Sequence, residues 1–222
     1  MPALLLGSIS TVVDTSELQR ESFNRAFEQH GLDWRWEREE YADLLGGNGG
    51  ADRVADYAAQ RGEDVDAAAV HATKSQLFQD ALRSADLTPR DGVVETVRDA
   101  RAEGFKVALV TTTSRENLDA LAAAVSATLP FDEVFDLVVD SSQVSTPKPD
   151  GSAYRHALEA LEEDSEHAVA VEDNVGGVSA ARAAGVPCVA FPNQNTAGHD
   201  FDGAAGRVDE LGLAALRTLA GR

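Results

Sequence analysis

The chain has 222 residues, of which 43% are hydrophobic, so it can bury a substantial core and is not a disordered protein. Its 38 acidic residues outnumber its 19 basic ones and give a net charge of −19. Nucleic acids and anionic membrane surfaces would repel such a protein, so we expect neither as a partner. No apolar run approaches the roughly 18 residues of a membrane span, which argues against a membrane protein.

The acidic residues are spread over predicted helix surfaces, and only three lysines accompany them: Lys74, Lys106 and Lys148. One explanation is an ordinary solvated acidic surface. The other is adaptation to molar intracellular salt, because charge repulsion is tolerable where the Debye length is about 3 Å, as at 1 M salt. We favour this second, halophilic interpretation.

The single cysteine, Cys188, excludes an internal disulfide and lies in an apolar segment, which predicts an inert buried thiol. The segment at the N-terminus lacks the basic flank and the length of a signal peptide. Both features lead us to expect a protein of the reducing cytoplasm.

The first part of the chain contains one predicted strand, Ala3–Leu6, and then helices alone. Asp14 and Glu17 have the spacing of a capping box, which predicts Asp14 as the N-cap of the first long helix. A glycine-rich turn, 46–50, separates two of the helices. Trp34 and Trp36 are expected to pack inside this helical region. The expected helices are Leu18–Gln29, Glu37–Leu45, Ala51–Arg61 and Asp66–Arg83.

From Asp91 onward, short apolar runs alternate with helical segments, which predicts a parallel sheet covered on both faces. Ligands of such sheets lie beyond the carboxyl ends of the strands. The expected strands are Lys106–Val110, Phe135–Asp140, His167–Val171 and Cys188–Phe191. The expected helices are Val93–Glu103, Arg115–Val125, Ser152–Leu161 and Gly177–Ala184.

Polar side chains follow these strands at the end where a ligand is expected. Thr111 follows the second strand, Lys148 lies between two prolines after the third, and Glu172 and Asp173 follow the fourth. Taken singly, each has a structural explanation: the threonine or the acidic pair as helix caps, the lysine as a surface residue. Together they are a hydroxyl and an ammonium for phosphate oxygens and two carboxylates for Mg²⁺.

The order and spacing of these motifs resemble the haloacid dehalogenase (HAD) superfamily, in particular the subgroup around β-phosphoglucomutase and phosphoglycolate phosphatase. The resemblance rests on three segments: 107–117, the Lys148-Pro149-Asp150 motif with Tyr154 after it, and 171–185. It implies a Rossmann-like α/β core with a parallel sheet, at 1–14 and 86–222, and an inserted all-helical cap domain at 15–85.

The same resemblance implies roles for individual residues. Thr111 and Lys148 correspond to the phosphate-binding residues, and Asp173 and Glu172 to Mg²⁺ ligands. Arg53, in a segment that resembles the substrate-specificity loop of the cap, matches a family arginine. The implied ligand is a small phosphorylated molecule.

The first motif departs from the family pattern, in which one aspartate is the nucleophile and a second is the general acid/base. Gly7 and Ile9 occupy these two positions and can do neither task. We expect both positions to face a hydrated crevice rather than a packed core. Ser8, Ser10 or Thr11 could replace the nucleophile only with an adjacent base, and no histidine lies near them in the sequence.

Two functions are therefore open. One is a weakly active phosphatase or phosphomutase whose remaining activity rests on Thr111, Lys148 and Asp173. The other, which we favour, is a catalytically silent relative that binds a phosphorylated ligand or a protein partner. Because one metal carboxylate is missing at Gly7, Mg²⁺ is expected to bind weakly or not at all.

Overall fold

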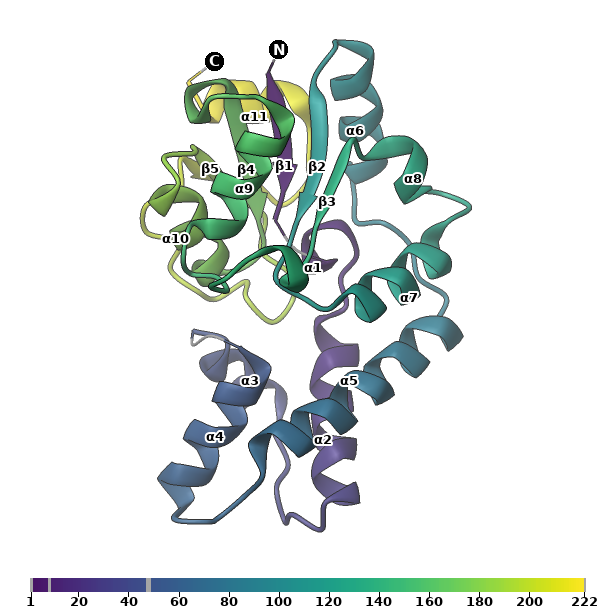
Figure 1. Ribbon diagram of the computed structural model, residues 1–222, viewed down its shortest axis with the longest axis vertical. Coiled ribbons are helices and arrows are strands. Elements are labelled where there is room, and N and C mark those ends of the chain that lie inside the picture. Colours follow the sequence, from purple (N-terminus) through teal and green to yellow (C-terminus); the bar gives the residue numbers. More distant parts are fainter. Residues whose placement is uncertain (1, 8, 47–48, 222) are drawn as a thin grey trace.

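A parallel sheet of six strands lies at the centre of the core in the computed structural model, which describes residues 2–7, 9–46 and 49–221 (Figure 1). The strand order is β3-β2-β1-β4-β5-β6, and every neighbouring pair is parallel. The first strand is thus central, with the motif-bearing strands on both sides of it. The strands are β1 (Ala3–Leu6), β2 (Lys106–Val110), β3 (Leu137–Val139), β4 (Ala168–Glu172), β5 (Cys188–Ala190) and β6 (Gly206–Arg207).

Alternate residues of the strands pack into two apolar clusters, one on each face of the sheet. Leu4 and Leu6 belong to one cluster, whereas Ala3 and Leu5 belong to the other. Burial on both faces explains why these strands are continuous apolar runs in the sequence. Helices α6 (Val93–Ala102), α7 (Arg115–Val125) and α11 (Leu213–Leu219) contribute to the first cluster, and α9 (Ser152–Leu161) and α10 (Val175–Ala183) to the second. The predicted α/β fold class is confirmed.

The segment between β1 and β2 is helical and has an apolar cluster of its own, which includes Phe23, Phe27, Trp34 and Trp36. Both tryptophans are buried there, as the sequence predicted. This part of the molecule stands apart from the sheet in Figure 1. Its helices are α2 (Ser16–Gln29), α3 (Arg38–Leu44), α4 (Gly50–Arg61) and α5 (Ala67–Ser84).

Helix α5 connects this helical cap with the core. Val70 and Leu77 of α5 belong to the apolar cluster of the cap, whereas Phe78 and Leu82, further along the helix, belong to the sheet cluster. The chain passes from one unit to the other along a continuous helix. The domain limits at 14/15 and 85/86 stay a prediction.

Several local details differ from the sequence predictions. Helix α2 begins at Ser16 with Thr15 as its N-cap, and the Asp14 carboxylate instead accepts hydrogen bonds from Ser16, so the predicted capping box is wrong. The predicted strand from Phe135 is the shorter β3, because Phe131–Val134 forms the short helix α8 before it. Ahead of the first expected helix, residues 9–12 form the short helix α1 (Ile9–Val12). Gly47 and Asn48 of the predicted glycine turn lie outside the described residues.

Two further predictions concern burial and membranes. Cys188 is buried within β5, as expected for a structural cysteine. Burial also raises the pKa of its thiol well above 9.0, so the thiolate is disfavoured. Among the helices of the described residues, none combines the length and apolarity needed to cross a bilayer.

Candidate functional site

A cleft with a volume of about 510 Å³ lies between the carboxyl ends of the strands and the helical cap. Its core wall includes Gly7, Thr111 and Lys148, and its cap wall includes Arg53 and Lys74. The position follows from the topology, because the loops after parallel strands converge at one edge of the sheet. Residues from motifs more than a hundred positions apart therefore meet here.

Thr111 and Lys148, the two predicted phosphate-binding residues, both line the core wall. The Thr111 oxygen accepts a hydrogen bond of 3.2 Å from the backbone N–H of Thr113, which leaves its hydroxyl proton to donate elsewhere. The Lys148 ammonium donates to the carbonyl oxygens of Gly7 and Val110, the latter at 2.7 Å. Lys148 therefore connects β1 with β2 at the end of the sheet.

The third partner of Lys148 is Glu172. Lys148 Nζ lies 2.6 Å from Glu172 Oε1, and the hydroxyl of Tyr154 donates to the same oxygen at 2.7 Å. Glu172 is completely buried, and this burial raises the pKa of its carboxyl group, while the neighbouring ammonium opposes the rise. Burial also raises the pKa of Tyr154 well above 10.0, so its hydroxyl stays protonated and can act as a hydrogen-bond donor.

Gly7 and Ile9, which the sequence resemblance predicts at the nucleophile and acid/base positions, do not both face open space. A Cβ atom on Gly7 would lie 2.1 Å from Glu172 Cδ and 2.5 Å from the hydroxyl of Tyr154. Ile9 reaches the cleft but is 5% exposed and packs in the sheet cluster. The expectation of a hydrated crevice at both positions is therefore wrong: the side chain of Glu172 fills the space beside Gly7.

Asp173 lines the cleft and accepts hydrogen bonds from three neutral side chains. Its Oδ1 accepts from the Thr11 hydroxyl and the Asn174 amide, both at 3.2 Å, and its Oδ2 accepts from the Asn193 amide at 2.7 Å. Within the described parts of the chain, no three His, Cys, Asp or Glu side chains form a group that could hold a metal ion. A hard cation such as Mg²⁺ takes several oxygen ligands, so the residues present fit it poorly.

The cap wall carries positive charge opposite the sheet. Arg53, predicted from the sequence, lines the cleft, and its Nε donates to the carbonyl oxygen of Leu44 at 2.9 Å. Lys74 lies between the rings of Phe23 and Phe78, with Nζ 4.8 and 4.6 Å from their centroids. Burial and the nearby Arg53 lower the pKa of Lys74 to about 7.

Sequence reasoning missed Lys74 and two of its neighbours in the cleft, Gln19 and His71. Lys74 Nζ donates to Gln19 Oε1 at 3.2 Å. Burial and the charge of Lys74 lower the pKa of His71 from 6.5 to about 4, so it is neutral at pH 7. A signal was present for the lysine: it lies four residues after Val70 and three before Leu77, on the buried stripe of α5, where a charged residue is exceptional.

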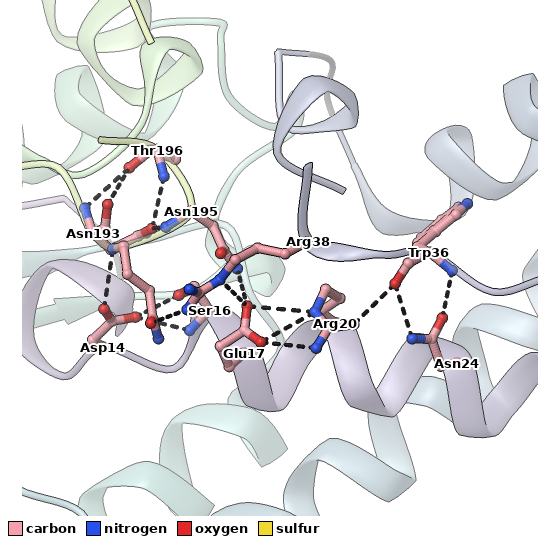
Figure 2. A network of polar contacts seen from close by, with 11 residues as sticks. Asp14, Ser16, Glu17, Arg20, Asn24, Trp36, Arg38, Asn193, Asn195 and Thr196 are labelled. Atoms are coloured by element: carbon pink, nitrogen blue, oxygen red, sulfur yellow. Dashed lines mark hydrogen bonds and ion pairs between the residues drawn. The ribbon is translucent and has the colours of Figure 1, made fainter. Parts of the chain in front are cut away.

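A network of polar contacts joins the cap to the loop that contains Asn193, Asn195 and Thr196 (Figure 2). Glu17 on α2 accepts hydrogen bonds from Arg20 and, at 2.8 Å, from the amide of Asn195. In the same loop the Thr196 hydroxyl donates to the backbone oxygen of Asp173 at 2.6 Å. The orientation of the cap is thus coupled to the residues behind the cleft.

Comparisons with known proteins agree with this geometry. The family model of the haloacid dehalogenase-like hydrolases matches residues 9–185. Protein CbbY of Rhodobacter capsulatus is 34% identical to this chain, over 99% of this chain and 97% of its own length.

Solved structures give the same result. The structure of CbbY from Rhodobacter sphaeroides in complex with phosphate has 34% identity and a TM-score of 0.87, covering 97% of this chain and 99% of that one. A mutant of that protein in complex with xylulose 1,5-bisphosphate has 34% identity, a TM-score of 0.88 and the same coverage. A β-phosphoglucomutase of Clostridium difficile, at 15% identity and a TM-score of 0.79, shares the fold. The resemblance derived from the sequence motifs is confirmed.

Proposed function

Since the chain belongs to the haloacid dehalogenase-like hydrolases, a family with phosphatase members, we propose that it binds a small phosphorylated sugar and does not hydrolyse it through an aspartyl phosphate. The observation that carries this proposal is at Gly7. No carboxylate is present there to attack phosphorus, and the adjoining space holds the side chain of Glu172. A covalent route needs an activated nucleophile at this point.

The hydroxyl groups of the first loop offer a poor substitute for the aspartate. Thr11 is fully buried and its hydroxyl is hydrogen-bonded to Asp173, so a ligand in the cleft does not reach it. Ser10 lines the cleft, and its hydroxyl lies 2.8 Å from that of Thr15 and 3.3 Å from the amide of Gln19. Neither partner is a base that could take the proton of serine at neutral pH. Ser8 lies outside the described residues.

Both walls of the cleft favour an anionic ligand. Lys148 and the Thr111 hydroxyl would hold one phosphate group at the core wall, and Arg53 and Lys74 would hold a second at the cap wall. A related CbbY structure contains xylulose 1,5-bisphosphate, which carries two phosphate groups on one sugar. We propose a sugar bisphosphate of this kind as the ligand class. A protein partner, the other ligand class predicted from the sequence, stays a prediction.

The test measures binding and hydrolysis of the same compound. In high-salt buffer, calorimetry should show that xylulose 1,5-bisphosphate binds, and more tightly than inorganic phosphate, for which we expect a dissociation constant in the millimolar range. Phosphate release over hours should not exceed the buffer background, with or without Mg²⁺. Rapid Mg²⁺-dependent release would favour the active-hydrolase alternative, and absence of binding would contradict the proposal.

A matched pair of variants tests the core wall. Lys148→Ala should weaken binding of xylulose 1,5-bisphosphate by about tenfold or more, since a charge-assisted contact is lost. Lys106→Ala is the control, because Lys106 lies at the opposite end of β2 from Thr111 and its ammonium pairs with Glu163 at 3.2 Å. If both variants bind alike, Lys148 does not hold the phosphate group.

A further inference from the structure

Glu172 has an environment unlike that of an exposed metal ligand. Its side chain is wedged between two glycines: a Cβ on Gly7 would lie 2.1 Å from its Cδ, and one on Gly177 would lie 2.0 Å from the same atom. Real Cβ atoms do not approach other atoms so closely, so glycine is required on both sides for the carboxylate to lie here. Glu172 is completely buried and, unlike Asp173, is not part of the wall of the cleft.

The contacts of the two carboxylate oxygens differ. Oε1 is shared by the Lys148 ammonium at 2.6 Å and the Tyr154 hydroxyl at 2.7 Å. Oε2 lies toward Gly177, and among the described residues it has no hydrogen-bond donor. An oxygen without a partner is a group that a cation could satisfy, but this one is sealed off from solvent and shares its carboxylate with an ammonium.

The charge balance also disfavours a divalent ion. Of the two predicted metal ligands, only Asp173 faces the cleft, and both of its oxygens already accept hydrogen bonds. The other predicted ligand, Glu172, is paired with a cation of the protein itself, the Lys148 ammonium. Mg²⁺ would have to displace an ammonium that the backbone oxygens of Gly7 and Val110 also hold in place.

We infer that Glu172 is the built-in counter-ion of Lys148 rather than a metal ligand, and that the cleft takes up a phosphate group without a divalent cation. This inference rests on the proposed function, since it specifies how the phosphorylated ligand is held. Glu172 and the phosphate group compete for the same ammonium, so the carboxylate weakens anion binding.

The first experiment uses the unaltered protein and inorganic phosphate as the probe. Calorimetric titrations in EDTA and in excess MgCl₂, at equal ionic strength, should give dissociation constants within about twofold of each other. Mn²⁺ added as a paramagnetic probe of direct metal binding should leave the relaxation of the solvent protons as in buffer alone. Phosphate binding tightened tenfold or more by Mg²⁺ would overturn the inference and leave the proposed function standing. Absence of phosphate binding in both buffers would overturn both.

The second experiment uses a substitution of Glu172, because a counter-ion and a metal ligand predict opposite changes in the affinity for phosphate. Glu172→Gln keeps the size of the side chain and removes its charge, so phosphate should bind about tenfold more tightly in EDTA. A metal ligand would behave in the reverse way, because its loss weakens phosphate binding in the presence of Mg²⁺. Glu159→Gln, which changes an exposed residue by the same unit of charge, is the control and should change the dissociation constant by less than twofold. Weaker phosphate binding by Glu172→Gln than by the control would contradict the inference.

Discussion

The side chain of Glu172 occupies the space into which a side chain at Gly7 would point, with 2.1 Å between Glu172 Cδ and the position of a Cβ on Gly7. The two residues are neighbours because β1 and β4 pair in parallel, with Leu6 opposite Val171. The buried position of the Glu172 carboxylate therefore depends on the absence of a side chain at position 7.

A side chain at position 7 should therefore destabilise the fold while Glu172 is present. Gly7→Ala should lower the free energy of unfolding by about 1–3 kcal/mol, the usual effect of overpacking a filled site. In a Glu172→Ala background the same substitution should lower the free energy of unfolding by clearly less, because the closest clash is gone and only the Tyr154 hydroxyl, 2.5 Å from the added Cβ, still has to shift. Urea unfolding of the four proteins in this cycle measures the coupling.

Gly198→Ala is the control for this cycle, since nothing lies within 4 Å of the added Cβ there. Equal effects of Gly7→Ala in both backgrounds would mean that Glu172 does not fill the site. For the same reason, Gly7→Asp with Ile9→Asp should not restore phosphatase activity unless Glu172 moves as well.

Lys74 should make stability depend on pH. Its pKa falls from 10.5 in the unfolded chain to about 7 in the folded protein. Between these pH values the unfolded chain binds more protons than the folded protein, so the free energy of unfolding rises with pH from about 7 to about 10.5. Below pH 7 the folded protein bears the full cost of burying the charged ammonium. Lys74→Met keeps the packing volume and removes the charge.

At pH 6, Lys74→Met should therefore raise the free energy of unfolding by about 1–3 kcal/mol, and the gain should shrink toward pH 10. Chemical unfolding at both pH values measures the difference. A variant that is less stable at pH 6 would show that the rings of Phe23 and Phe78 hold the ammonium favourably, by the attraction between a cation and an aromatic face.

Asn195 should influence the titration of Glu17 across the contact between cap and core. Burial raises the pKa of Glu17, but the hydrogen bonds from Arg20 and Asn195 outweigh it, so the pKa lies below 4.5. The ionised carboxylate of Glu17 therefore stabilises the fold above pH 4.5. This stabilisation is lost as the pH falls through the lower pKa that Glu17 has in the folded protein.

Asn195→Ala removes one hydrogen bond to a charged group, which should reduce stability at pH 7 by about 1–2 kcal/mol and raise the pKa of Glu17. Carboxyl-carbon NMR titration of both proteins tests this. Gln76→Ala is a suitable control, because Gln76 is exposed and its side-chain amide donates to Asp80 on the same helix at 3.3 Å. An unchanged pKa of Glu17 in Asn195→Ala would contradict the contact.

Because its surface is strongly acidic, the protein should be more stable in high salt than in low salt. We expect the melting temperature to rise by at least about 5 °C between 0.1 M and 1 M KCl, because the net charge of −19 is then screened over about 3 Å. The rise should level off above 1 M, where screening is nearly complete. A continued linear increase would point to exclusion of salt from the surface instead, and a flat or falling curve would remove the halophilic interpretation.

Sequence alone determined the fold class and the order of the motifs. Apolar runs such as Val107–Val110 can be recognised in the sequence because strands buried on both faces contain few polar residues. The end of such a strand also gives the position of the motif around Thr111. The absence of a carboxylate at Gly7 and Ile9 is likewise a fact of the sequence. These features are local, so no knowledge of distant contacts was needed to predict them.

Only the tertiary structure decided which side chain lies beside Gly7. Glu172 is 165 positions from Gly7 in the numbering of the chain, and nothing in its neighbourhood indicates that it turns toward the first strand rather than into the cleft. The same holds for Lys74, whose partner Gln19 and whose low pKa arise from the packing of α5 against α2. Burial and charge pairing depend on which segments meet in space, and a pattern along the chain does not contain that information.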